Sequence, residues 1–316
     1  MVNAITFVDL RGICRPRGDI RMDIDDFHGP GPERDWSEEF YFDFYDRNED
    51  VCGFMRLALR PNLREKEFQF FLLMPDGSVI GGKEMVPYDG QRLEAKGLAF
   101  TRTMPQGAWR LTMKANMPRI GGRVEKRSHV EMDLTFTGIN ETTPSEEGRA
   151  DAPGGPVTHA QQFGSVTGKL STGIEEFRID TLGSKDHSWG ARDLGSLDSW
   201  LLLTCHFSRD HAFSVIKCTS KGRDTDSGFV HVSGSNRPVA SVALRTNSGP
   251  DGSPKSMEVT VTDSSGAVHK TFAMVLKLTK TPVGGVREHT VHKMLIRCST
   301  EGNVGYGMAE LWVLSQ

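Results

Sequence analysis

The sequence lacks the features that mark several large classes of protein. Its five cysteines are widely spaced and form no CxxC or zinc-knuckle pattern. Unpaired thiols in a reducing compartment are therefore the simpler interpretation. No apolar run resembles a signal sequence or approaches the length of a membrane span. We expect a soluble, cytoplasmic protein with no stable membrane insertion.

Neither sign of charge dominates. The 38 basic and 41 acidic residues leave a net charge of -3 and are spread along the whole chain. Such a chain has no basic patch for nucleic acid or for an anionic membrane surface. We expect no nucleic-acid partner, and the composition is compatible with a homodimer.

Signatures of metal, nucleophilic and nucleotide chemistry are also missing. The ten histidines form no HxH, HExxH or facial-triad spacing, so no metal site is predicted. There is no GxSxG elbow, and no Gly-Gly pair leads from a strand into a helix. We therefore expect no cofactor.

Short runs of alternating polarity make up most of the chain. They are separated by turn residues, among 34 glycines and 15 prolines, as in antiparallel strands. The run from Glu39 to Tyr45 places three phenylalanines on one strand face and polar groups on the other, where we expect Glu38, Tyr41 and Asp43. No helix longer than two turns is predicted. The expected fold class is all-β.

A change of composition divides the sequence. Residues 144–158 are rich in Gly, Pro, Ser and charge and have almost nothing to bury. The segments on either side have similar length and strand density. We expect two consecutive antiparallel barrels or sandwiches, formed by residues 1–143 and 159–316, with 144–158 as the linker.

The stretch from Leu182 to Asp193 is the densest in chemical groups and is expected to form a loop. Asp186 or Asp193, shielded by Trp189, would keep its proton near neutral pH and donate it to a carbon–carbon double bond. His187 would orient this acid or bind water. The indole face of Trp189 would stabilise the resulting carbocation.

The same residues have a structural interpretation. Arg192 is expected to fix Asp186 or Asp193, and an Asp186–Arg192 pair could simply pin a turn while Trp189 fills the core. Further candidates for ligand binding are Tyr41, Asp43, His206, Tyr306 and Glu310. His206 interrupts an apolar strand, so it either points outward or lines a cavity. Glu310 either binds ligand or pairs with a barrel arginine.

Several segments resemble one known superfamily. Residues His159–Gly168, Phe177–Asp193 and Gly305–Glu310 resemble the double-lipocalin superfamily that contains AttH and carotenoid 1,2-hydratase (hydroxyneurosporene synthase). Trp36–Asp46 resembles the opening strand of uncharacterised relatives in that group. The resemblance implies two lipocalin-like barrels around an apolar cavity. It also implies hydration, dehydration or cyclisation of isoprenoid or polyketide substrates.

The resemblance also bears on individual residues. The carotenoid hydratases are associated with a His-x-Trp pair followed by a Tyr-x-Asp pair. His187 and Trp189 match the first pair. The only Tyr-x-Asp is formed by Tyr41 and Asp43, which lie upstream in the other half, so the water-activating role is unassigned.

These observations favour a cofactor-free enzyme, either a hydratase or dehydratase (a lyase) or a cyclase. It would act on a small apolar terpenoid-like or polyene substrate in a barrel cavity. The alternative is a non-catalytic carrier of a hydrophobic metabolite, since a barrel cavity binds by apolar burial with or without an acid. A third possibility is that 182–193 is only the hinge between the barrels.

Overall fold

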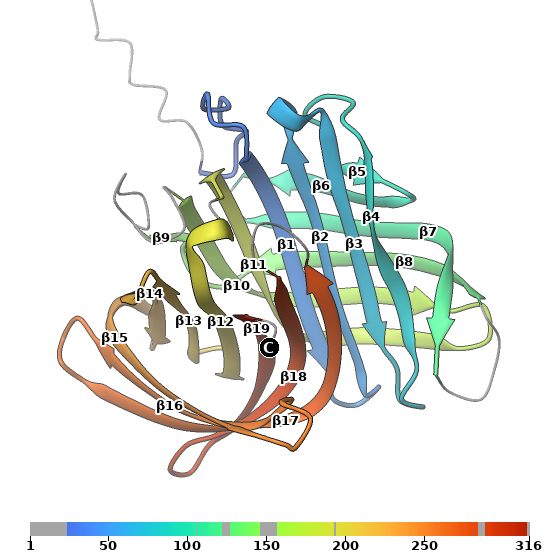
Figure 1. Ribbon diagram of the computed structural model, residues 1–316. Helices are drawn as coiled ribbons and strands as arrows, with labels where there is room; N and C mark the ends of the chain where they lie inside the picture. The colour runs from blue at the N-terminus through green and yellow to red at the C-terminus, as the bar shows by residue number, and fades with distance from the viewer. Residues whose placement is uncertain are drawn as a thin grey trace, which may run out of the picture.

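The computed structural model describes residues 24–105, 107–121, 127–145, 157–192, 194–283 and 288–314. Most of these residues lie in antiparallel strands (Figure 1). The helices within these ranges are two single 3-10 turns, η1 (Pro61–Leu63) and η2 (Leu194–Ser196). The all-β prediction is confirmed. Over the same ranges, no helix is long and apolar enough to cross a bilayer.

The first sheet has eleven strands. They are β1 (Trp36–Asp46), β2 (Val51–Arg60), β3 (Glu65–Leu73), β4 (Val79–Pro87), β5 (Glu94–Ala95), β6 (Leu98–Met104), β7 (Ala108–Ile120), β8 (Arg127–Gly138), β9 (Thr143–Ser145), β10 (Val157–Ser171) and β11 (Glu176–Ala191). Their order is β4-β3-β2-β1-β11-β10-β8-β7-β6-β5, and β9 pairs with β10. A short additional pairing of β4 with β7 brings the two sides of the sheet together, so the sheet curls into a barrel.

The second sheet is a closed barrel of consecutive strands. They are β12 (Leu197–Ser208), β13 (His211–Ser220), β14 (Arg223–Val232), β15 (Ser235–Ser248), β16 (Pro254–Asp263), β17 (Val268–Val283), β18 (His289–Ser299) and β19 (Val304–Leu314). Pairing of β19 with β12 closes the barrel and leaves no free edge.

Strand pairing divides the chain later than its composition predicts. β10 and β11 follow the expected linker, yet β10 pairs with β8 and β11 pairs with β1 in the first sheet. The chain enters the second barrel only at β12. A boundary at 144–158 is therefore wrong for sheet membership, because a polar composition reports exposure to water and not which strands pair.

Period-two alternation explains the core of the first barrel. Phe40, Phe42 and Phe44 point to one side of β1 and are buried with aromatic and aliphatic side chains from the other strands. Apolar side chains of the second barrel fill its interior in the same way. An eight-stranded barrel is just wide enough for its own side chains to fill it.

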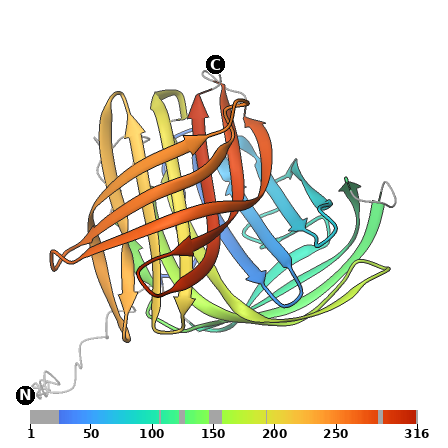
Figure 2. The ribbon, with the colours of Figure 1, turned by 90° about the horizontal axis from the view of Figure 1, so that it is seen from below.

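The two barrels lie side by side (Figures 1 and 2). The outer face of β1, β2, β10 and β11 packs against the outer face of the second barrel. Cys52, Phe54 and Leu73 of the first sheet form a buried cluster there with Leu295 and Met308. This contact buries polar side chains as well, and it contains most of the residues that the sequence singled out.

Candidate functional site

The stretch 182–191 is strand, not the expected loop. It forms the second half of β11, which pairs with β1 on one side and β10 on the other. Neighbouring side chains on such a strand point to opposite faces of the sheet. Asp186 therefore faces the second barrel, whereas His187 and Trp189 face the interior of the first barrel.

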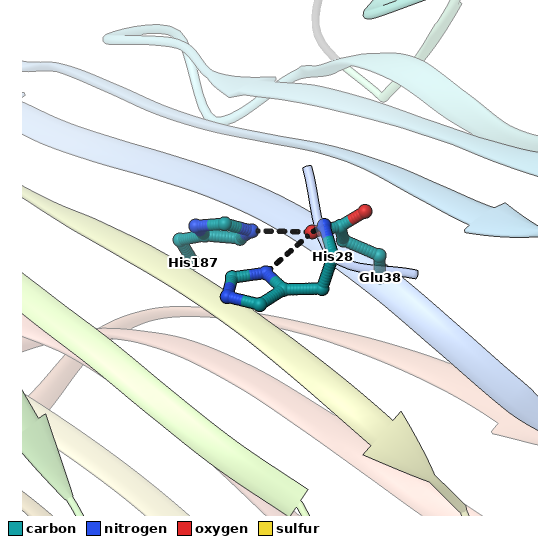
Figure 3. Close-up of side chains that lie close together, drawn as sticks. All are labelled: His28, Glu38 and His187. Atoms are coloured by element: carbon teal, nitrogen blue, oxygen red, sulfur yellow. Dashed lines mark hydrogen bonds and ion pairs between the residues drawn. The ribbon is translucent and has the colours of Figure 1, made fainter. Parts of the chain in front are cut away.

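His187 and Trp189 meet Glu38, at the start of β1, and His28, in the segment before β1. Figure 3 shows His28, Glu38 and His187. The Oε1 atom of Glu38 lies 3.0 Å from Nε2 of His187 and 2.9 Å from Nδ1 of His28. The backbone N–H of His28 donates to the same oxygen at 2.9 Å. We call His28, Glu38 and His187 the barrel-mouth cluster.

Aromatic rings hold the barrel-mouth cluster in place. The His28 ring stacks on Trp189 with centroids 3.6 Å apart, and the His187 ring stacks on Phe40 at 4.0 Å. Burial opposes ionisation of Glu38, but hydrogen bonds from His187 and His28 outweigh it and lower the pKa of the carboxyl. Glu38 thus lies on the interior face with Phe40, not on the polar face where it was expected.

A buried ion pair lies beside this cluster. Lys185 donates to both carboxylate oxygens of Asp25, at 2.6 and 2.7 Å, and both side chains are fully buried. Asp25 belongs to the segment before β1, and Lys185 belongs to β11. The pair therefore ties the N-terminal segment of the described chain to the first barrel.

Asp186 has a different set of partners. Its carboxylate lies 2.9 Å from Nδ1 of His159 and 3.4 Å from Nε2 of Gln161. The side-chain Oε1 of Gln161 accepts a hydrogen bond from the Ser214 hydroxyl of the second barrel. Asp186 cannot act on the same atom as Trp189, because a β-sheet separates them. The predicted trio of Asp186, His187 and Trp189 is therefore divided.

Tyr41, Asp43 and His206 do come together. All three lie at the contact between the barrels. The Ser184 amide donates to Asp43 at 3.2 Å, and the Ser184 hydroxyl lies 3.0 Å from Nε2 of His206. Tyr41 is two residues from Asp43 and on the same face of β1. We call Tyr41, Asp43, Ser184 and His206 the interface cluster.

Burial changes the protonation of this cluster. Burial raises the pKa of Asp43 to about 7, and the hydrogen bonds from Ser184 only partly offset this. The second carboxylate oxygen of Asp43 is buried and has no hydrogen-bond partner within the described residues. Burial lowers the pKa of His206 to about 4, so the imidazole is neutral near pH 7. Asp43 is thus a buried carboxyl that holds a proton close to neutral pH.

Glu310 and a lysine lie next to the interface cluster. Glu310 pairs with Lys293 and accepts a hydrogen bond from the Trp312 indole at 2.6 Å, so its partner is a lysine and not an arginine. The Lys293 ammonium lies 5.6 Å from the ring centre of Tyr41 and 5.2 Å from that of Phe54. Burial lowers the pKa of Lys293 well below its ordinary value, so pairing with Glu310 is what favours its charged form beside these rings.

The remaining predicted residues lie at the rim or elsewhere. Tyr306 is half-buried, and its ring centre is 5.3 Å from that of Tyr45 at the edge of the interface. Arg192 donates to Ser37 and Ser188 and not to Asp186, so the expected pair with that carboxylate is absent from the described contacts. Asp193 lies outside the described residues.

Sequence reasoning missed His28, Lys185 and Lys293. His28 stands in a Gly- and Pro-rich lead-in that showed no periodicity, and only the fold places it against residue 187. Lys185 and Lys293 each interrupt an apolar strand face, which was the available signal. The prediction of no metal site depended on spacing along the chain. Such spacing cannot detect the barrel-mouth cluster, because its members are residues 28, 38 and 187, which only the fold brings together.

A large groove lies away from both clusters. It has a volume of about 1020 Å³, runs over β7, β8, β10 and β11, and is lined by charged residues such as Arg110, Asp133, Arg178 and Asp180. It contains none of the predicted site residues. Arg110 and Asp133 pair with each other on its exposed surface, and we assign the groove no role.

Solved structures share this architecture. An AttH-type protein from Nitrosomonas europaea has a TM-score of 0.61 at 11% identity, covering 87% of this chain and 92% of that one. Crystal structures of CghA, with and without Sch210972, have TM-scores of 0.59 and 0.61 at 13% and 12% identity, with 89% of each chain covered. The protein therefore has the lipocalin-like double-barrel fold.

Sequence comparison identifies the family but not a function. No curated protein matches the chain. One family model matches residues 22–312, which include all nineteen strands except the last two residues of β19. The chain therefore belongs to the family described as a domain of unknown function, DUF7064.

Proposed function

We propose that the protein is an enzyme that protonates a carbon–carbon double bond of an apolar substrate at the interface between its two barrels. Asp43 is the acid. The observation that carries the proposal is that Asp43 is buried, has a pKa raised to about 7, and keeps one oxygen without a partner among the described residues. A catalytic acid works best when its pKa lies near the operating pH.

The proposed reaction begins with transfer of the Asp43 proton to one alkene carbon, which leaves a carbocation at the other. The ring faces of Tyr41 and Phe54, whose centres lie 5.6 and 5.2 Å from the Lys293 nitrogen, would stabilise this cation. Addition of water and return of a proton to Asp43 gives hydration, and the reverse gives dehydration. Attack by a second double bond closes a ring and moves the cation to a new carbon, and return of a proton from the adjacent carbon to Asp43 completes the cyclisation.

The surroundings of Asp43 support this assignment over Asp186. Asp186 is held by His159 and Gln161. Asp43 is held by Ser184, with Tyr41 beside it, and these groups do not offset the effect of burial on its pKa. The neutral His206, hydrogen-bonded to Ser184, is the proposed water-binding group. The half-buried Tyr45 and Tyr306 rings mark the proposed entry for substrate.

The comparison with CghA supports a small-molecule ligand, because one of its structures contains Sch210972. A carrier would also bind such a ligand. The buried acid is what favours an enzyme, since a carrier has no use for a carboxyl that is protonated near pH 7.

Turnover in heavy water tests the proposal. The purified chain is incubated with isoprenoid and polyene alkenes in D₂O, and products are analysed by mass spectrometry. We expect an isomer or a product with one water gained or lost, carrying deuterium on carbon. Asp43→Asn should reduce the rate roughly 100-fold or more, whereas Asp133→Asn, an exposed carboxylate paired with Arg110, should not.

Two outcomes would contradict the proposal. Undiminished turnover by a folded Asp43→Asn variant would remove Asp43 as the acid. An unchanged apolar ligand, bound one per chain with no product formed, would identify a carrier.

A further inference from the structure

The barrel-mouth cluster has the composition of a metal site. Two imidazoles and one carboxylate converge, and their ligand atoms all lie within 4.8 Å of one another. We propose that His28, Glu38 and His187 bind one divalent d-block cation of the zinc type. Three nitrogen and oxygen ligands with a further position for water form a common catalytic zinc site.

Hydrogen bonding determines which nitrogen of His187 can bind metal. Its Nδ1 lies 2.9 Å from the Ile24 carbonyl oxygen, which can only accept a hydrogen bond, so Nδ1 carries a hydrogen. Nε2 is then the nitrogen whose lone pair would bind a cation, in place of the hydrogen bond that it now makes to Glu38. Metal-binding histidines commonly donate their other N–H to a backbone carbonyl in this way.

The spacing is close to that of a coordinated ion. Two ligand atoms at zinc-ligand distance in a tetrahedral site are about 3.4 Å apart. Oε1 of Glu38 lies 2.9 Å from the His28 nitrogen and 3.0 Å from the His187 nitrogen. These two separations would widen by about half an ångström to admit the cation, and the two nitrogens, which lie within 4.8 Å of each other, would face it from either side of the carboxylate.

The charges favour a cation at this point. The Glu38 carboxylate is almost completely buried, and its charged neighbours among the described residues are imidazoles, not Lys or Arg. The nearby Lys185 is already paired with Asp25. A buried carboxylate needs a counter-charge, and a divalent ion would provide a permanent one.

The proposed site is preorganised and is accessible from one side. Trp189 and Phe40 stack on the two imidazoles and fix their rotation. His187 and Glu38 are buried, while the His28 side chain is 15% exposed. Water or a ligand would reach the cation past His28. Bound metal would also attach the segment before β1 to β1 and β11.

Metal titration of the full chain without a histidine tag tests the proposal. After treatment with a chelator and dialysis, calorimetry with Zn²⁺ should give one ion per chain, and Zn²⁺ should raise the melting temperature. Co²⁺ should give a d–d spectrum without a thiolate band, which separates this site from the cysteines.

Variants localise the binding. His28→Ala and the near-isosteric Glu38→Gln should each weaken Zn²⁺ binding roughly tenfold or more. His129→Ala is the matched control, because His129 also contacts a glutamate, Glu131, at 3.1 Å but on the exposed surface. It should bind as the wild type does.

The proposal is wrong if the wild type does not bind about one metal ion per chain. The contact between His187 and Glu38 would then be only a hydrogen bond. It is also wrong if the cobalt spectrum shows thiolate ligands or if folded Glu38→Gln binds Zn²⁺ normally. Circular dichroism establishes folding, and Glu38→Gln decides the matter if His28→Ala does not fold.

Discussion

The buried carboxylates of this protein differ in what balances their charge. Asp25 has Lys185, and Glu39 lies between Arg56 and Arg192. Although burial alone would raise the pKa of Glu39, the two arginines lower it to about 2. Asp43 receives no such partner, and burial dominates. The same physics therefore produces an ionised structural carboxylate and a protonated candidate acid on one strand.

The raised pKa of Asp43 makes stability depend on pH. The pKa rises from 3.8 to about 7 on folding, so the folded state binds more protons within this window. The protonated Asp43 carboxyl contributes its full stabilisation below pH 3.8, the pKa of the unfolded chain. This contribution is lost as the pH rises to about 7, the pKa of the folded protein. Asp43→Asn cannot ionise and lacks this dependence.

Urea unfolding across the window measures the effect. As the pH rises through this window, the wild type should lose free energy of unfolding relative to Asp43→Asn. The difference should grow by up to about 1.4 kcal/mol per pH unit. Parallel pH profiles for the two proteins would show that Asp43 is ionised throughout.

Asp25→Asn should destabilise the protein by about 3–5 kcal/mol, because it removes the carboxylate that pairs with the buried Lys185 charge. Thermal or urea unfolding gives the change. Adding Lys185→Met should recover part of the loss. Equal stability of the single variant and the wild type would mean that water reaches Lys185.

Among the elements, β11 shows what sequence could and could not predict. Its residues indicated a functional stretch, and His187 and Trp189 do meet in one cluster. Clustered polar residues were taken as a loop because a strand with two paired neighbours usually reads as apolar. β11 breaks that rule because each of its faces meets a polar cluster.

The strands that sequence missed are short or glycine-rich. β4 contains Gly81, whose φ of +141° and contact with the Phe70 carbonyl exclude a side chain. The expected strand from Glu39 to Tyr45 lies within β1, because alternation over six or more residues is a strong signal.

The closing strand β19 supplies a test of the second barrel. A Cβ atom at Gly307 would lie 1.9 Å from the Thr204 carbonyl oxygen of β12. Gly307→Ala should therefore force β19 away from β12 and cost about 1–3 kcal/mol of stability. Gly82→Ala, at a strand position with open space, is the control and should change stability by less than about 0.5 kcal/mol. Equal effects would mean that β19 adjusts freely.

For the whole molecule, sequence predicted two β-barrels but not how the chain is shared between them. The first barrel needs β10 and β11 to continue the sheet from β1 and β8. Residue types on single strands do not reveal which distant strand is the neighbour. The interface residues were recognisable as unusual one by one, yet their meeting depends on the packing of the two barrels.

Truncation tests this division. A chain ending at residue 192 keeps all strands of the first sheet and should show a β-type circular dichroism spectrum and cooperative unfolding. A chain ending at residue 158 removes nearly all of β10 and all of β11, leaves β1 and β8 with unpaired edges, and should be unfolded or aggregated. A folded shorter fragment would support the boundary read from composition.

The protonation state of Asp43 underlies the proposed activity and can be measured without knowing the substrate. Carbon-13 NMR of aspartate-labelled protein, with Asp43→Asn to assign the signal, follows its carboxyl through a pH titration. We predict a midpoint at about 7. A midpoint near the ordinary value of 3.8 would mean that Asp43 is ionised at neutral pH and is not the acid.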